Sequence, residues 1–167
     1  MKRIGLLSDT HGYLDQKVFD FFDQVDEIWH AGDFGTMEVS DQLEDFKPLF
    51  GVHGNIDGRK LRTKHPLDQR FICEGMNTWM THIGGYPGRY DQRVRKELNT
   101  SSVPGLFICG HSHILKIMND EKYKMMTMNP GATGRIGLHK IRTAIRFEVD
   151  NGALHNLEVI ELGSRSQ

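Results

Sequence analysis

The chain has 167 residues, which suits one domain with a single sizeable core, so we expect one domain over residues 1–167. Its formal net charge is −1 at pH 7, so the chain does not have the excess of basic residues that is typical of a dedicated nucleic-acid binder. The apolar run at residues 4–7 is too short for a signal-peptide core, and no later stretch is long enough to span a membrane. These features favour a cytoplasmic protein over a secreted or membrane protein.

The cysteines also favour a cytoplasmic protein, and the histidines suggest metal binding. Cys73 and Cys109 both lie in apolar, strand-like runs, which is typical of buried free thiols in a reducing compartment. Nine histidines are many for a chain of this charge. Because histidine is the commonest metal ligand in proteins, we examine where these side chains fall.

The first half of the chain alternates between strands and helices. Strand, helix, strand, helix and strand are expected at about residues 3–9, 14–25, 27–32, 36–46 and 48–54. The first helix would place Leu14, Val18, Phe21 and Val25 on one face. This order favours right-handed crossover connections and a parallel sheet.

The second half has a different pattern. Residues 70–75 and 77–82 predict a hairpin that turns at residues 74–77, and Tyr90, Val94 and Leu98 mark one more helix. Strands are then expected at about residues 105–109, 114–119, 122–128, 143–150 and 153–162. We therefore expect an α/β fold in which a parallel half joins an antiparallel half, packed as two sheets.

Polar side chains follow five of the predicted strands, at the point where each strand ends. Oxygen or imidazole groups recur there in "SDTHG", "HAGDFG", "HGNID", "THIGG" and "CGHSH". The carboxyl ends of strands line the ligand crevice of open α/β sheets. The set consists of Asp9, His11, Asp33, Asn55, His82, His111 and His113.

These residue types suit a pair of divalent cations. A site of this kind needs about four protein ligands and open positions for water, so seven residues suffice if one carboxylate is shared. Asp33 is the natural bridge because a carboxylate has two oxygens and an imidazole has one free lone pair. We expect the D-x-H and H-x-H spacings to direct each pair of side chains the same way from an extended backbone. With no thiolate in the set, the expected metals are manganese, iron, cobalt, nickel or zinc.

Each motif alone is explained by turn chemistry or by a structural histidine, and only their combination favours a metal site. Taken together, "DTH", "GD", "GNID", the isolated His82 and "GHSH" followed by "NPGA" resemble the calcineurin-like metallophosphoesterases. Within that superfamily they are most similar to its small single-domain prokaryotic phosphodiesterases. The resemblance implies a four-layer α/β/β/α sandwich, in which two mixed sheets are flanked by helices.

The resemblance also implies a ligand set for each of two divalent cations, with Mn²⁺ as our first candidate and Fe²⁺, Ni²⁺, Co²⁺ and Zn²⁺ as alternatives. It assigns the first cation to Asp9, His11, Asp33 and His113. It assigns the second cation to Asp33, Asn55, His82 and His111. Asp33, Asn55 and His82 would be the catalytic ligands nearest the nucleophile, a metal-bridging hydroxide, and nearest the substrate.

Position 56 departs from the pattern of many members. Their motif is "GNHE" or "GNHD", with a histidine placed to protonate the leaving group, and here the residue is Ile56. The acid that many members carry after the second aspartate is absent too, because Asp33 stands in "GDFGTME". No separate general acid is identified. Two weaker candidates for substrate contact are His53, which adjoins Gly54-Asn55, and Arg89, in the loop after His82.

The expected activity is hydrolysis of small phosphodiesters, with no dedicated nucleic-acid surface, no membrane partner, and a homo-oligomer left open. A phosphomonoesterase is one alternative. A catalytically silent protein-interaction scaffold like the retromer small subunit is another, although that alternative predicts missing ligands and all seven positions are filled. The sequence does not specify the natural substrate or the physiological metal.

Four further histidines are expected to be structural or surface residues: His30, His65, His139 and His155. Asp57 has two interpretations of equal weight. It could hold a metal ligand in place, or it could cap a short helical turn over residues 57–61.

Overall fold

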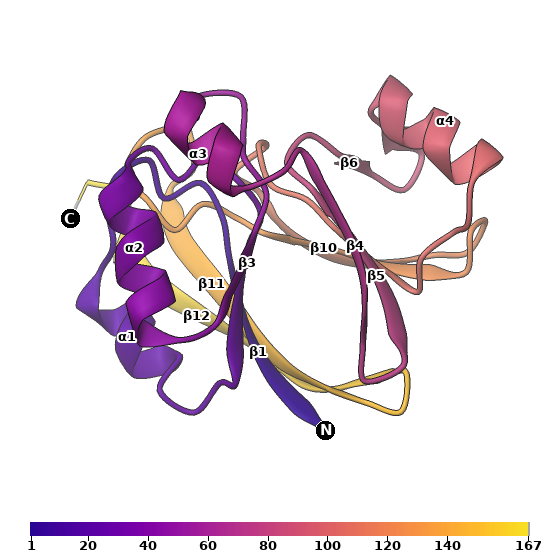
Figure 1. The fold of residues 1–167 in the computed structure, drawn as a ribbon, viewed down its shortest axis with the longest axis horizontal. Helices are drawn as coiled ribbons and strands as arrows, with labels where there is room; N and C mark the ends of the chain where they lie inside the picture. The colour runs from indigo at the N-terminus through magenta and orange to yellow at the C-terminus, as the bar shows by residue number, and fades with distance from the viewer. Residues whose placement is uncertain (167) are drawn as a thin grey trace.

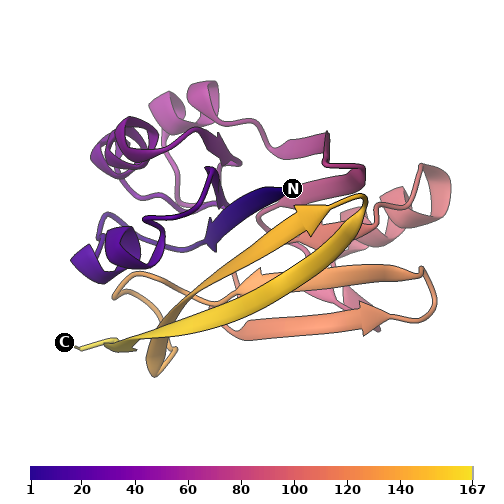
Figure 2. The same ribbon diagram turned by 90° about the horizontal axis from the view of Figure 1, so that it is seen from below.

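Two five-stranded sheets lie face to face in the structure, a computed structural model that describes residues 1–166 (Figures 1 and 2). The first sheet has the order β12-β11-β1-β2-β3. Its parallel strands are β1 (Lys2–Leu7), β2 (Glu27–His30) and β3 (Leu49–Gly51), and its antiparallel strands are β11 (Ile141–Asp150) and β12 (Ala153–Ser164).

The second sheet has the order β4-β5-β8-β10-β9. Its strands are β4 (Asp68–Cys73), β5 (Met76–Thr81), β8 (Leu106–Ile108), β10 (Met125–Pro130) and β9 (Leu115–Asp120). β5, β8 and β10 run parallel, and the outer strands pair antiparallel to them. A small ribbon of β6 (Gly85–Tyr86) and β7 (Arg89–Tyr90) stands apart from both sheets.

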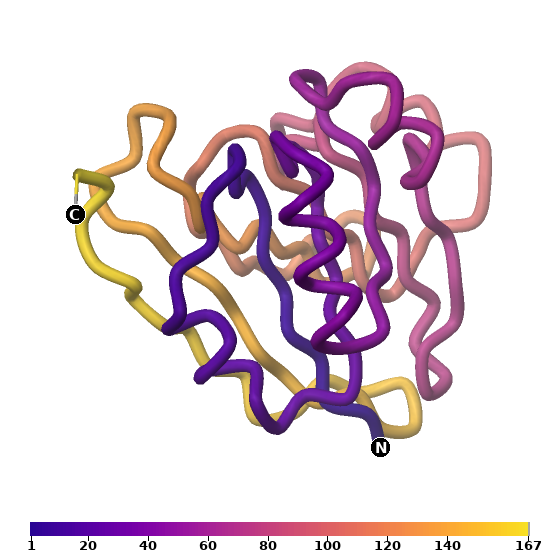
Figure 3. Tube along the Cα trace, turned by 60° about the vertical axis from the view of Figure 1, so that its left-hand side comes forward, coloured from indigo at the N-terminus to yellow at the C-terminus, as the bar shows by residue number. Residues whose placement is uncertain are grey.

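Helices cover the outer face of each sheet. α1 (Gln16–Phe21), α2 (Met37–Phe46) and α3 (Arg59–Lys64) lie on the first sheet (Figure 3). Val18, Leu43 and Leu61 pack there on strand residues such as Ile28. α4 (Gln92–Thr100) lies on the second sheet. The resulting α/β/β/α order confirms the predicted fold class.

Strand periodicity explains how the layers join. In β8, Leu106 and Ile108 face the apolar core between the sheets, while Phe107 faces the opposite way and packs with α4. Side chains alternate across a strand, so a fully apolar strand can serve two cores at once. Gly5 in β1 leaves room for the Phe22 ring, since a Cβ there would lie 2.9 Å from it.

The structure corrects the predicted division into a parallel and an antiparallel half. The C-terminal hairpin β11–β12 joins the first sheet beside β1, and parallel pairs occur in both sheets. Both sheets are therefore mixed. The sequence did not predict this because hydrophobic periodicity identifies strands but not the strands that they pair with. The hairpin of the second sheet turns at Glu74-Gly75, with Met76 and Asn77 already in β5.

Other boundaries moved by a few residues. α1 ends at Phe21 and not at Val25, although Val25 still packs in the same apolar cluster. β10 begins at Met125, because residues 121–124 form the turn after β9. Within residues 1–166, none of the helices is long and apolar enough to cross a membrane.

Candidate metal centre

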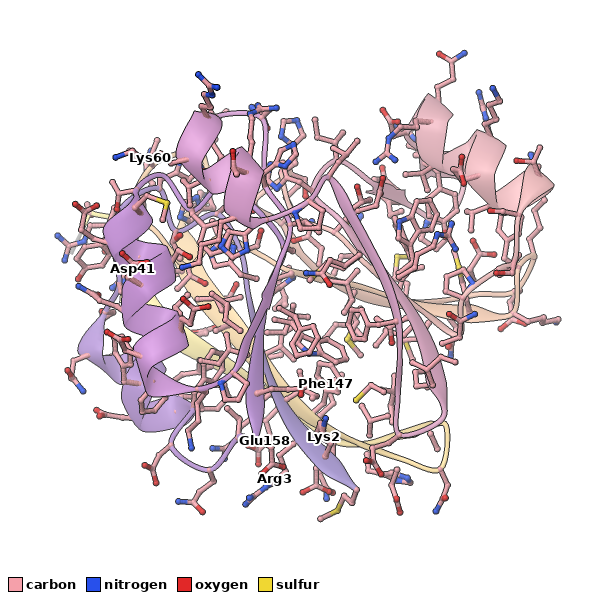
Figure 4. The ribbon with its side chains drawn as sticks, viewed as in Figure 1. Lys2, Arg3, Asp41, Lys60, Phe147 and Glu158 are labelled. Carbon is pink, nitrogen blue, oxygen red and sulfur yellow. The ribbon has the colours of Figure 1, made fainter. Side chains whose placement is uncertain are left out.

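The seven predicted donor side chains converge from both sheets. Asp9, Asp33 and Asn55 follow β1, β2 and β3 of the first sheet, and His82 and His111 follow β5 and β8 of the second. These strand ends lie at the end of the molecule that carries α3, away from Lys2 and Arg3 near the N-terminus (Figures 1 and 4). Parallel strands in both sheets therefore bring distant sequence segments to one edge.

A first group consists of Asp9, His11 and His113, whose donor atoms all lie within 4.8 Å of one another. His113 Nε2 lies 3.1 Å from Asp9 Oδ1 and 3.4 Å from His11 Nε2. His11 Nε2 lies 3.8 Å from the same Asp9 oxygen. Two imidazole nitrogens and one carboxylate oxygen thus face a common point.

A second group consists of Asp33, His82 and His111, with donor atoms again within 4.8 Å. Asn55 belongs with it, because Asn55 Oδ1 lies 3.1 Å from His82 Nε2 and 3.0 Å from His111 Nδ1. All four residues of the predicted second set are therefore together.

The Asp33 carboxylate lies between the two groups. Asp33 Oδ2 is 3.2 Å from His82 Nε2 in the second group and 3.6 Å from His11 Nε2 in the first. Its other oxygen, Oδ1, accepts a hydrogen bond from the Ile56 backbone N–H at 3.1 Å. This position is the one expected of a carboxylate shared by two cations.

The donor set fits divalent cations. Asp9 Oδ1 is buried and has no hydrogen-bond partner within residues 1–166, although buried carboxylate oxygens are normally partnered. The ring nitrogen of His82 that faces away, Nδ1, lies 2.8 Å from the Ala31 carbonyl oxygen. Because a carbonyl only accepts, Nδ1 carries the proton and Nε2 presents its lone pair to the site.

The charge distribution also favours cation binding. Burial disfavours ionisation of Asp9, but the adjacent imidazoles of His11 and His113 outweigh it and hold the pKa of Asp9 well below its usual range. Burial lowers the pKa of His82, and the Asp33 carboxylate outweighs that effect and raises it above its ordinary value. Asp9 is thus an anion with the imidazoles of His11 and His113 beside it.

Backbone groups hold the carboxylates in place. Asp9 Oδ2 accepts from the Ser8 hydroxyl at 2.6 Å and from the His111 N–H at 3.1 Å, which links the two sheets. Glycines allow the close approach: a Cβ on Gly54 would lie 1.9 Å from Asp33 Oδ1, and one on Gly110 would lie 2.8 Å from Asp9 Oδ2. The loops are therefore shaped around the two aspartates.

Five of the seven donor residues have a left-handed backbone, with φ between 46° and 69°: Asp9, His11, Asp33, His111 and His113. This conformation costs a non-glycine residue about 1 kcal/mol or more, and it clusters at functional sites. The expectation of extended backbone at the D-x-H and H-x-H motifs is therefore wrong. His111 and His113 also diverge, each joining a different group, and do not point the same way.

Asp57 holds two loops together. Its carboxylate accepts hydrogen bonds from the backbone N–H groups of Phe34 (3.2 Å), Gly35 (2.9 Å) and Gly54 (2.9 Å). Its side chain is buried, and the cap residue of α3 is Gly58. The helix-cap interpretation is wrong, and Asp57 fixes the loop after Asp33 against the loop that bears Asn55.

His30 is a structural residue, as predicted. It is fully buried, its Nδ1 accepts from the Gly32 N–H at 3.1 Å, and its Nε2 lies 3.0 Å from the Thr10 hydroxyl. Its ring stacks on Phe34, which stacks in turn on His65. Burial lowers the pKa of both histidines, to about 4 for His65, so both are neutral at pH 7. His155 is exposed.

Two residues that contact the donor loops could not be identified from the sequence. Arg62 of α3 donates to the carbonyl oxygens of Asp57, Gly54 and Asn55 at 2.6, 3.3 and 3.1 Å, which restrains the Asn55 loop. His139, predicted only to be structural or on the surface, packs edge-on against His113 with ring centroids 5.1 Å apart. Both contacts depend on loop geometry that spacing does not encode.

The candidate substrate contacts lie in two hollows that flank the second group. His53 lines one of them together with Asn55 and His82, and Arg89 lines the other together with His111. Ile56 is 48% exposed and offers no titratable side chain.

Comparison with known proteins identifies the family. The sequence model of the calcineurin-like phosphoesterase superfamily domain matches residues 1–152. A "Probable metallophosphoesterase" from Methanothermobacter thermautotrophicus is 32% identical over 134 residues, 77% of this chain and 76% of the relative. A second protein of that name, from Methanocaldococcus jannaschii, is 34% identical over 137 residues, 77% of this chain and 67% of the relative.

Solved structures share the fold. A novel archaeal phosphodiesterase is 22% identical with a TM-score of 0.76, covering 96% of this chain and 99% of that one. The Vps29 of Chaetomium thermophilum is 15% identical with a TM-score of 0.75, covering 96% and 95%. At these identities the likeness concerns the fold alone. The match over residues 1–152 shows that the chain belongs to the calcineurin-like phosphoesterase superfamily.

Proposed function

We propose that this superfamily member is a phosphodiesterase that hydrolyses small phosphodiesters at a centre of two divalent cations. Family membership supports a metal-dependent phosphoesterase. The observation that carries the finer proposal is the position of the Asp33 carboxylate between two groups of donor atoms. Manganese is our first candidate for both positions, since the donors are oxygens and imidazoles without thiolate.

Asp9, His11, Asp33 and His113 would hold the first cation, and Asp33, Asn55, His82 and His111 the second. Bound divalent cations supply Lewis acidity, which lowers the pKa of bound water to about 7 and neutralises phosphate oxygens. The chain's own residues set the geometry. The Ala31 carbonyl fixes the tautomer of His82, and the Ser8 hydroxyl orients Asp9.

The charges around the centre bear on the choice between a diester and a monoester. Only two carboxylates oppose the charge of two dications, so the centre would be positive and would attract an anionic phosphate ester. The hollow beside Asn55 also contains His53 and Arg93, but Arg93 is already paired with Asp68 at 2.8 Å. Arg62 also lines this hollow, and its guanidinium donates to the carbonyl oxygens of Asp57, Gly54 and Asn55. Few uncommitted cations remain there to match the second charge of a monoester. A phosphomonoesterase is the first alternative.

A non-catalytic scaffold is the second alternative. Likeness of fold extends to Vps29 proteins as well as to a phosphodiesterase, so fold does not decide between them. The complete donor set favours the enzyme. We also propose that the protein is cytoplasmic and acts without nucleic-acid or membrane partners. A homo-oligomer remains open, and the mass of the protein in solution tests it.

The test combines metal stoichiometry with a substrate panel. Calorimetric titration of EDTA-treated protein with Mn²⁺ should give two sites, and His111→Ala or His113→Ala should each lose one. His155→Ala, which replaces an exposed histidine, is the matched control and should keep both.

Turnover is then measured on phosphodiesters and monoesters with manganese, nickel, cobalt, zinc and magnesium. Faster turnover of diesters supports the proposal. Metal binding with faster monoester turnover would assign a phosphomonoesterase, and no metal binding would assign a scaffold.

A further inference from the structure

Two hollows of about 290 Å³ each adjoin the second donor group and share Ile83 and Asp91 on their walls. The first contains His111, and the second contains Asn55 and His82. Neither contains Asp9, His11 or His113 of the first group. A ligand would therefore reach the centre from the side of the second group.

A third hollow does not communicate with this centre. It contains Arg3, Phe147 and Glu158, which lie near the N-terminus at the end of the molecule away from α3 (Figure 4). Both of its arginines are already in ion pairs, Arg146 with Glu158 and Arg3 with Asp26. Of these three hollows, the two beside the second group adjoin the donor residues and offer space for a substituent.

The hollow beside His111 is apolar on two sides. Ile83 is 38% exposed and Ile114 is 58% exposed, and both line it. Met128 closes its base and is buried. Large apolar side chains left exposed around a concave site are typical of a surface that receives an apolar ligand group.

A cation and an aromatic ring meet in the same hollow. Lys116 Nζ lies 3.5 Å from the centroid of the Tyr86 ring. Lys116 is half-buried, yet it forms no ion pair with any acid in residues 1–166. The face of the Tyr86 ring therefore provides the close partner of this ammonium, as a cation–π contact.

Arg89 and Asp91 complete the charges that line the hollow. Arg89 is exposed and, like Lys116, has no carboxylate partner among the described residues. The Asp91 carboxylate accepts from the Arg93 backbone N–H at 2.9 Å and begins α4. The hollow therefore has apolar walls and a net charge of one positive unit from Arg89, Lys116 and Asp91, and the Lys116 ammonium lies over the Tyr86 ring.

We propose that the hollow formed by Ile83, Tyr86, Ile114 and Lys116 binds a planar aromatic substituent of the phosphodiester, which places the Lys116 ammonium between two rings. The substituent is an aryl ring or a nucleobase. A volume of about 290 Å³ admits one such group and not an oligonucleotide. This inference rests on the proposed function, because the phosphoryl group it positions is the one beside His111.

Binding of non-hydrolysable phosphonates tests the hollow apart from turnover. The Mn²⁺-loaded and the EDTA-treated protein are titrated with phenylphosphonate, cyclohexylphosphonate and methylphosphonate. Burial of a ring should make phenylphosphonate bind roughly tenfold or more tightly than methylphosphonate. The cation–π contact should make it bind about fivefold more tightly than cyclohexylphosphonate.

Variants locate the effect. Tyr86→Leu and Lys116→Met should remove the preference for phenyl over cyclohexyl, and Tyr86→Phe should keep it. Lys60→Met, at an exposed lysine of α3, is the matched control and should behave as the wild type (Figure 4). Thymidine 5′-monophosphate and ribose 5-phosphate form the nucleobase arm, and a preference for the former identifies a nucleobase as a ligand.

Equal affinity for phenyl- and methylphosphonate would overturn the inference and leave an anion site only. A phenyl preference that survives both Tyr86→Leu and Lys116→Met would also overturn it. A phenyl preference without any hydrolysis of diesters would leave the hollow intact and refute the proposed activity. The two failures are therefore distinguishable.

Discussion

The backbone N–H of Ile56 donates a hydrogen bond to Asp33 Oδ1, 3.1 Å away. Position 56 thus contributes to the candidate centre although its side chain has no acid–base chemistry. The contribution comes from the main chain, so it is independent of the residue type except proline, which has no N–H.

We predict that Ile56→Ala leaves Mn²⁺ affinity within about twofold of the wild type. Ile56→Pro should weaken it about tenfold, which corresponds to one hydrogen bond to a charged group. Calorimetric titration measures both, with circular dichroism to confirm that each variant is folded. Equal affinity of a folded Ile56→Pro variant would contradict the role of this N–H.

Loss of the Asp57 carboxylate should loosen two loops at once. Asparagine has one acceptor oxygen, so Asp57→Asn leaves at least one of three backbone N–H groups facing an amide NH₂. We expect a loss of about 3 kcal/mol in the free energy of unfolding, with weaker Mn²⁺ binding. Urea denaturation measures the first effect, and exposed Asp45→Asn is the control. Equal stabilities of the two variants would refute the assignment.

Acid should destabilise the fold through His65. Burial lowers the pKa of His65 to about 4 in the folded protein, against an ordinary value of 6.5. Between these values the unfolded chain binds a proton that the folded chain does not, so stability falls as the pH drops from about 6.5 to about 4.

The corresponding variant is His65→Gln, which keeps a polar partner for the Ser40 hydroxyl. Between pH 7 and pH 5 the wild type should lose about 2 kcal/mol more stability than this variant. Urea denaturation in EDTA measures both losses without a contribution from metal binding. Equal losses would show that His65 is not the titrating group.

The absence of a histidine at position 56 predicts that the rate of hydrolysis depends strongly on the leaving group. A general acid typically contributes 10²–10⁴-fold, and its absence matters most for alkoxides. We expect bis-p-nitrophenyl phosphate to be cleaved at least about 10²-fold faster than a dialkyl phosphate, measured as kcat/KM. Comparable rates would mean that another group protonates the leaving oxygen. His53→Ala then tests the nearest candidate, because His53 lines the hollow beside Asn55.

The sequence was sufficient to predict that seven donors would meet, because each follows a strand and strand ends share an edge. It also predicted the membership of each group through the family resemblance, with Asp33 between them. It was insufficient for the backbone at His11 and His113, where a left-handed conformation aims the rings. That conformation is imposed by tertiary contacts, such as the hydrogen bond from the His11 N–H to the Asp33 carbonyl oxygen at 3.1 Å.

The sequence was also insufficient to predict which strands pair. Residues 143–150 read correctly as a strand, but nothing in their alternation specifies β1 as the partner. Asp57 shows the same limit on a smaller scale, since its three hydrogen-bond donors come from two loops. Partners remote in sequence are selected by the packed fold and not by local pattern.

The pairing of β1 with β11 has a consequence for synthesis on the ribosome. Lys2 pairs with Val149 and Leu6 with Ile145, so β1 is completed by a strand that is synthesised long after it. Until residues 141–150 emerge, one edge of β1 has no partner from this sheet. Contacts of such long sequence separation slow folding, and an open strand edge invites intermolecular association. The edge of β1 is therefore open to intermolecular association until the β11–β12 hairpin has been made.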